Sequence, residues 1–186
     1  RYVLHVPGVG RSYPFAVTPR VHREVTQAAL KGFYFQRAST ALPERYAGQW
    51  QRAAGHPDTS VIVHPSAATQ ARPAGTRFSA SKGWYDAGDY GKYVVNSGIS
   101  TATLLSLYED FPAFARQLGV YIPEGTDTMP DVLNESLWNL QWMLRMQDPA
   151  DGGVYHKLTT PDFEAKTVAP VEAAKPRYVV QKSTAA

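Results

Sequence analysis

The sequence of 186 residues contains no cysteine, which excludes disulfide bonds and thiolate metal sites. It has no apolar run close to the roughly 20 residues that a membrane-spanning helix needs, so we expect no membrane partner. It also has no large excess of charge, because 19 Lys and Arg residues against 16 Asp and Glu residues give a net charge of +3. Without a basic cluster, so small a charge argues against nucleic acid as a partner. The sequence contains no secretory leader pattern and starts abruptly at Arg1, so we expect further residues upstream.

What the sequence does have is a dense run of glycine, aromatic and acidic residues over 82–93. Asp86 and Asp89 lie three positions apart, and the glycines around them allow sharp bends and a close approach to a ligand. Two carboxylates held together repel each other, which raises the pKa of one of them. Both can also bind the same water molecule. We therefore interpret them as candidate catalytic residues, with a general base that activates water. The alternative is that they only cap the following helix, because Asp commonly accepts hydrogen bonds from free backbone N–H groups there.

Hydrophobic spacing in a chain with 44% hydrophobic and 19% charged residues indicates one globular domain with several helices. Helices are predicted over residues 18–37, beginning at Thr18-Pro19, and over 91–110, ending at Phe111-Pro112. A third helix is predicted from Pro130. It carries an apolar leucine stripe at positions 133, 137, 140 and 144, with Glu135 in a capping context, and we expect this chain alone to leave apolar helix faces uncovered.

The segments between these helices read mostly as loops. Residues 56–82 and 161–177 contain prolines and no periodic pattern. Residues 154–159 alternate like a short strand, and residues 178–186 read as the start of another helix.

Lys92 is close in sequence to the acidic pair and could lower the pKa values of Asp86 and Asp89, although a solvated lysine is an equal alternative.

The run over 83–93 reads Gly-Trp-Tyr-Asp-Ala-Gly-Asp-Tyr-Gly-Lys-Tyr and resembles the N-terminal signature of glycoside hydrolase family 9, the inverting cellulases. Segments 30–37, 130–138 and 151–157 resemble other parts of the family in the same order. The resemblance implies an all-α fold over residues 18–186, as the N-terminal portion of an (α/α)6 barrel. It also implies that residues 1–17 are the terminal strand and linker of a preceding immunoglobulin-like β-sandwich.

For function, the resemblance implies hydrolysis of β-1,4-glucosidic bonds in cellulose or related β-glucans with inversion. Asp89 is then the general base and Asp86 helps to position the water. Trp84 and Tyr85, whose flat rings suit stacking on a sugar, and His156 are then substrate-binding residues. Inversion needs a second carboxyl group across the scissile bond, and nothing in this chain matches the family acid. We expect that acid in the remainder of the catalytic domain, the chain alone to be inactive, and the protein to be secreted or periplasmic.

The resemblance also concerns metals. Many family members with an immunoglobulin-like module carry a zinc site built from cysteines and a histidine. Ala38 stands where a family cysteine would follow Gln36-Arg37, so we expect that zinc site to be missing. His56, Asp58 and His64 could act as metal ligands, but we favour surface histidines in a polar loop.

Calcium is a weaker alternative at Asp148 and Asp151. The oxygens of these residues suit the ion, but their spacing lacks an EF-hand pattern and its final glutamate. We expect no cofactor within this chain, while the resemblance allows calcium in the missing part of the domain.

Two other classes of function remain open at this point. A non-catalytic β-glucan-binding protein would keep the aromatic cleft and lack the acid. A helical interaction module would use the Asp pair only as a cap.

Overall fold

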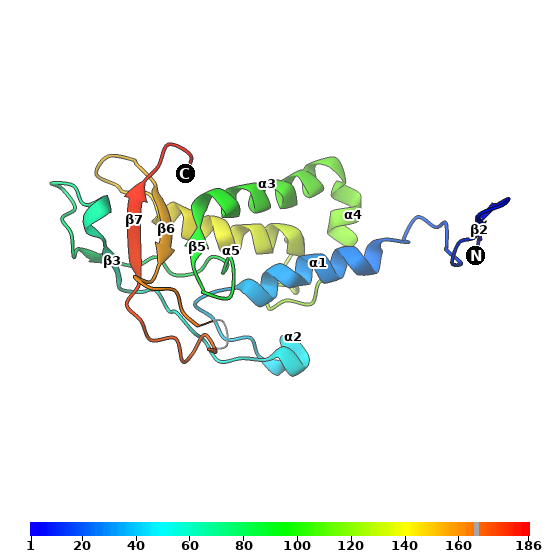
Figure 1. Ribbon diagram of the computed structural model, residues 1–186, viewed down its shortest axis with the longest axis horizontal. Coiled ribbons are helices and arrows are strands. Elements are labelled where there is room, and N and C mark those ends of the chain that lie inside the picture. Colours follow the sequence, from blue (N-terminus) through cyan, green and yellow to red (C-terminus); the bar gives the residue numbers. More distant parts are fainter. Residues whose placement is uncertain (166–167) are drawn as a thin grey trace.

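The computed structural model describes residues 1–165 and 168–186. Three long helices lie side by side, a small sheet packs at one end of them, and an N-terminal hairpin projects from the other end (Figure 1). The helices are α1 (Arg23–Gln36), α2 (Glu44–Ala47), α3 (Val94–Asp110), α4 (Pro112–Gln117) and α5 (Asp131–Arg145), with 3-10 turns at Gly48–Trp50 and Pro65–Ala67. The strands are β1 (His5–Val6), β2 (Gly10–Arg11), β3 (Val61–Val63), β4 (Arg77–Phe78), β5 (Lys92–Tyr93), β6 (Tyr155–Thr159) and β7 (Tyr178–Lys182). No helix in these two ranges is long and apolar enough to cross a membrane.

A five-stranded sheet with the order β4-β3-β7-β6-β5 corrects the expectation of an all-α fold. The predicted strand over 154–159 is confirmed as β6, whereas the predicted helix start at 178 is wrong, because β7 lies there. Val179 and Val180 are β-branched and favour a strand, and Val179 is buried in the core. β3 corrects the predicted loop over 56–82, and its run of three buried residues is too short for periodicity to identify.

The predicted surface loop over 161–177 has no helix or strand where the structure describes it, and residues 166–167 lie outside the described residues.

The boundaries of α1 and α3 differ from prediction at their starts. α1 ends at Gln36, next to its predicted end, but it begins at Arg23 rather than near Pro19. α3 begins at Val94, because the two residues before it form β5 and pair with β6. Phe111-Pro112 ends α3 as predicted, and the proline also begins α4, where its missing N–H suits the first turn.

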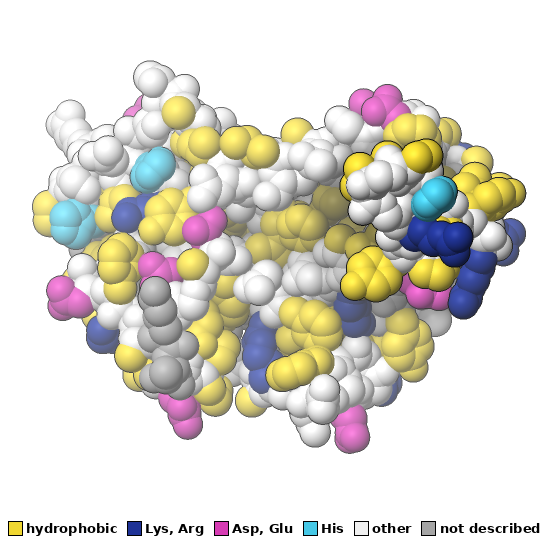
Figure 2. Space-filling model, turned by 45° about the vertical axis from the view of Figure 1, so that its right-hand side comes forward, with side chains coloured by type: hydrophobic (Ala, Val, Ile, Leu, Met, Phe, Trp, Pro, Cys, Tyr) yellow, Lys and Arg dark blue, Asp and Glu magenta, His cyan; other side chains and the backbone are white. Residues whose placement is uncertain are grey.

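α5 occupies its predicted place, and its leucine stripe is only partly buried. Leu144 is 71% exposed and Leu137 is 39% exposed, whereas Asn139 is fully buried. The Asn139 amide donates to Thr101 Oγ1 on α3 at 3.0 Å, so its burial leaves that donor satisfied. Polar groups with partners thus share the interior with Trp142, while Leu137 and Leu144 join other hydrophobic side chains on the surface, some of which Figure 2 shows on one face.

Two groups of buried side chains form the core. One lies among the helices and includes Tyr34 and Trp84. The other joins α3 and α5 to the sheet and includes Trp142 and Val179. The run over 83–93 therefore lies where both parts of the core meet.

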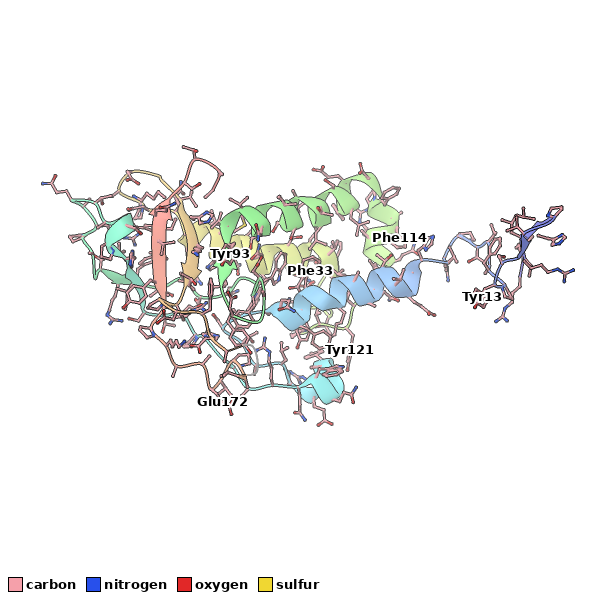
Figure 3. All side chains as sticks on the ribbon, viewed as in Figure 1. Tyr13, Phe33, Tyr93, Phe114, Tyr121 and Glu172 are labelled. Atoms are coloured by element: carbon pink, nitrogen blue, oxygen red, sulfur yellow. The ribbon has the colours of Figure 1, made fainter. Side chains whose placement is uncertain are left out.

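Residues 1–17 form a hairpin of their own, in which every residue is exposed. β1 pairs with β2, and the backbones of Tyr2 and Phe15 exchange hydrogen bonds of 2.7 and 2.9 Å. Tyr13 lies on this projecting segment (Figure 3). The predicted short strands with a turn are confirmed, while their origin in an immunoglobulin-like module stays a prediction.

We expect Gly83→Ala to destabilise the protein by about 1–3 kcal/mol. Gly83 has φ +81°, and a Cβ there would lie 2.7 Å from Cγ of Trp142. Gly75→Ala is the matched control, because Gly75 has φ +85° with open space around it, so it adds backbone strain without the clash. Urea unfolding measures both variants, and equal destabilisation would contradict the close packing on Trp142.

Candidate active site

The turn that carries Asp86 and Asp89 is closed by its own hydrogen bonds. The Asp86 N–H donates to the Gly91 carbonyl at 2.9 Å, and the Tyr90 N–H donates to the Ala87 carbonyl at 3.0 Å. Asp89 Oδ1 accepts from the Gly91 N–H at 3.1 Å. The backbone at both carboxylates is therefore fixed.

Both carboxylates are accessible, since Asp86 is exposed and Asp89 is half-buried. Asn96 Nδ2 on α3 donates to Asp86 Oδ1 at 2.8 Å. The second oxygen of each carboxylate accepts no hydrogen bond from the residues that the structure describes, which leaves it open to water. α3 starts after Tyr93 without a side-chain cap, so the interpretation of the pair as a helix cap is wrong.

Trp84 and Tyr85, the predicted sugar-stacking residues, are only 5% and 4% exposed. The Trp84 ring packs on Phe33 with 4.7 Å between centroids, and its Nε1 donates to Glu135 at 2.8 Å (Phe33 is labelled in Figure 3). Both residues also line a pocket of about 190 Å³ next to Asp86. Any contact with substrate would run through this pocket, and the role of the two rings stays a prediction.

His156, the third predicted substrate-binding residue, lies on β6 beside β5. Its ring meets the ring of Tyr93 edge-on, with 6.2 Å between centroids and an 85° angle between planes. Burial, followed by the charges of Asp89 and Asp86, raises the pKa of Tyr93. Tyr93 thus adjoins both His156 and the acidic pair, so the sheet register brings His156 to this side of the molecule.

Glu135 does not cap α5 as predicted but lies in a buried ion pair. Its side chain is 1% exposed, and its Oε2 lies 2.9 Å from Nη2 of Arg37. Arg37 also binds Glu124 at 2.9 Å. Burial raises the pKa of Glu135 despite the opposing effect of Arg37. Because Arg37 and Glu135 lie 98 positions apart, the sequence alone does not indicate this pair. The pair supports Trp84 at the start of the motif, since Glu135 accepts from its Nε1.

Lys92 does not bind the acidic pair and is not solvated, so both sequence interpretations of it are wrong. Its side chain is fully buried, and its Nζ lies 2.7 Å from Asp58 Oδ2. Asp58 is buried as well, contrary to its predicted place in a polar loop, and it also pairs with Arg177 Nε at 3.0 Å. Burial alone would raise the pKa of Asp58, but the two cations reverse this and lower it.

His56 is buried too, which corrects its assignment as a surface histidine. Its Nδ1 lies 2.9 Å from the Tyr85 hydroxyl. Burial, with the added charge of Arg177, lowers the pKa of His56 to about 4, and burial raises the pKa of Tyr85. Both side chains are therefore neutral at pH 7. His64 is exposed, as predicted, and its ring bonds Ser66.

A zinc ion does not fit these residues. Ala38 offers no ligand atom, and His56 Nδ1 is engaged with Tyr85. The guanidinium of Arg177 places a positive charge beside the imidazole, which opposes a divalent cation. Over 1–165 and 168–186, no group of three or more His, Cys, Asp or Glu residues is arranged to hold a metal.

Asp148 and Asp151, the alternative calcium ligands, bind an ammonium group instead. Nζ of Lys182 lies 2.7 Å from Asp148 Oδ2 and 2.6 Å from Asp151 Oδ2. Asp148 also accepts from the Tyr155 hydroxyl at 3.1 Å. A lysine on β7 thus supplies the positive charge that calcium would bring.

Two accessible carboxylates on a fixed turn beside a pocket could hold a water molecule and accept its proton, which is what a general base requires. The model of the family described as glycosyl hydrolase family 9 matches residues 22–186. The chain belongs to this family, as its motifs predict.

Relatives and solved structures agree with this assignment. A xyloglucan-specific endo-beta-1,4-glucanase from Bacteroides ovatus is 53% identical over 186 residues, which cover 100% of this chain and 31% of the relative. Endoglucanase D from Acetivibrio thermocellus is 32% identical over 187 residues, covering 100% of this chain and 29% of the relative. The structure of a Bacteroides ovatus family 9 protein superposes with a TM-score of 0.89 and 52% identity, over 98% of this chain and 33% of that one. The family 9 endoglucanase J30 superposes with a TM-score of 0.84 and 32% identity, over 95% and 33%. The chain thus spans about a third of the length of these proteins.

We expect His56 to make stability depend on pH. Its pKa is about 4 in the folded chain against 6.5 for an ordinary histidine, so the unfolded state binds more protons between these values. The contribution of His56 is complete above pH 6.5 and is lost as the pH falls through 4. Urea unfolding at several pH values between 4 and 7 measures this. The free energy of unfolding should change less with pH in His56→Gln than in the unmutated protein. His64→Gln is the exposed control, and an unchanged slope in His56→Gln would contradict the assignment.

Proposed function

We propose that the protein carrying this chain hydrolyses β-1,4-glucosidic bonds of a β-glucan with inversion, with Asp89 as the general base. The observation that supports this most is the accessible pair of Asp86 and Asp89 on its fixed turn, in a chain of family 9. Similar proteins are named endoglucanases, which favours a β-1,4-glucan as substrate. Xyloglucan is the first candidate, because the relative with 53% identity is named for it.

In this mechanism Asp89 takes a proton from a water molecule, and Asp86 helps to hold that water. The Gly91 N–H orients Asp89 and the Asn96 amide orients Asp86, so each carboxylate keeps one free oxygen for water. Inversion needs a second carboxyl group about 6.5–9.5 Å away across the scissile bond. Among the described residues, Asp86 is the only carboxylate that lines the adjacent pocket. We therefore assign the acid to a part of the catalytic domain outside this chain, and this chain to the N-terminal portion of an (α/α)6 barrel.

The substrate-binding residues in this proposal are His156, Trp84 and Tyr85. His156 would approach the sugar from β6, and the two rings would contact it through the pocket beside Asp86. A polymeric glucan stays outside the cytoplasm, so the proposal includes a secreted or periplasmic location.

We expect Asp89→Asn to lower kcat by about 10²–10⁴-fold, the usual contribution of a general base. Asp86→Asn should have a smaller effect, because Asp86 only helps to hold the water. Reducing-sugar release from xyloglucan and carboxymethylcellulose by the full-length gene product measures both variants. Asp110→Asn makes the same change at an exposed carboxylate that ends α3, and it should leave kcat unchanged.

Two outcomes would contradict this assignment. Full activity in Asp89→Asn would remove Asp89 as the base. Glucan binding without hydrolysis by the unmutated full-length protein would favour the non-catalytic binding protein.

A further inference from the structure

Three buried charged side chains outside the acidic pair meet at the two ends of its turn: Asp58, Lys92 and Arg177. We propose that they are positioning residues, which hold the turn with Asp86 and Asp89 in its working geometry. The inference rests on the proposed function, since it assigns these residues to the placement of the general base. We call Asp58, Lys92 and Arg177 the clamp.

Lys92 holds the start of the segment. Its Nζ donates to the Lys82 carbonyl at 2.6 Å and to the Ala80 carbonyl at 3.1 Å, and it pairs with Asp58 at 2.7 Å. All three protons of the ammonium group are therefore used. Lys82 has φ +72°, a conformation that costs free energy for a residue with a side chain. The bonds from Lys92 hold that backbone in place and join residue 82 to residue 92.

Arg177 holds the end of the turn. Its Nη1 donates to the Tyr90 carbonyl at 2.7 Å. Tyr90 follows Asp89 directly and has φ +59°, so a second strained residue is fixed next to the proposed base. Its Nε and Nη2 donate to Asp58 at 3.0 and 3.3 Å, which ties the turn to a buried anion.

Asp58 is the common partner and keeps the clamp together. The three side chains are 1%, 0% and 7% exposed in the order Asp58, Lys92, Arg177. Burial lowers the pKa of Lys92 to about 8, so the ammonium stays charged at neutral pH. Removing Arg177 leaves Asp58 paired with Lys92, but it takes the donors from Asp58 Oδ1 and from the Tyr90 carbonyl, which favours a rearrangement of the turn.

Lys182 provides a matched control within the same sheet. It lies on β7 and pairs with the buried Asp148, as Arg177 pairs with the buried Asp58, although Lys182 is 19% exposed against 7% for Arg177. In the described part of the chain, its ammonium makes no hydrogen bond to residues 80–92. Lys182→Met therefore removes a comparable ion pair without touching the turn.

In the full-length gene product, we expect Arg177→Met to lower kcat on xyloglucan about 10- to 100-fold, with KM changed less than about twofold. The reason is that a misplaced base slows the reaction more than it weakens binding of a long substrate. Arg177→Lys should recover part of the loss, because it keeps the charge. Lys182→Met should leave kcat unchanged when all variants are assayed below their unfolding temperatures. Equal losses in Arg177→Met and Lys182→Met would overturn the clamp, because they would indicate general destabilisation.

Hydrogen exchange gives a second measurement that needs no activity. The Asp86 and Tyr90 amides bond within the turn, so they should exchange faster in Arg177→Met and not in Lys182→Met. This result in a protein that hydrolyses no glucan would contradict the proposed function and still support the clamp on the turn. Unchanged protection of both amides in Arg177→Met would overturn the clamp even if the unmutated protein is active.

Discussion

The geometry around the acidic turn depends on charged side chains that are buried and paired within the chain. Arg37 with Glu135 on one side and Asp58 with its two cations on the other are almost inaccessible to water. None of these groups could be buried without a partner of opposite charge, because an unpaired buried charge is strongly destabilising. Their partners lie far apart in the sequence, so the charges are paired only when the whole fold is assembled. The turn joins both networks, since Trp84 donates to the first and the Tyr90 carbonyl accepts from the second.

The small sheet connects the acidic turn to residues that are distant in the sequence. β5 follows the turn directly and pairs with β6, and β6 pairs with β7. This order brings His156 against Tyr93, and it brings Arg177, which precedes β7, to the Tyr90 carbonyl next to Asp89. The register matters as much as the order, because a slip by one residue would turn Lys92 from the buried face to the opposite one. The sheet is therefore part of the site rather than an addition to a helical fold.

Local patterns in the sequence predicted what local forces decide. The turn at Asp86 and Asp89, the end of α1, the position of α5 and the strand β6 all follow from spacing and turn chemistry. The predictions failed where distant partners decide the outcome. β7 forms because β3 and β6 are available to pair with it, and the polar face of α5 is buried because Arg37 and Thr101 satisfy it. The members of these pairs lie farther apart than the short windows in which hydrophobic periodicity is read.

The loop around Asp148 and Asp151 carries its own cation. In many extracellular proteins an acidic loop takes its shape from a divalent ion, and it loses that shape when the ion is removed. Here the ammonium of Lys182 is covalently part of the chain, so it is present at one equivalent from synthesis onward. We therefore expect the form of this loop to depend on these ion pairs and to be unchanged by added calcium or by a chelator. Its vulnerability is chemical instead, because acylation of one lysine would neutralise the charge on which both carboxylates depend.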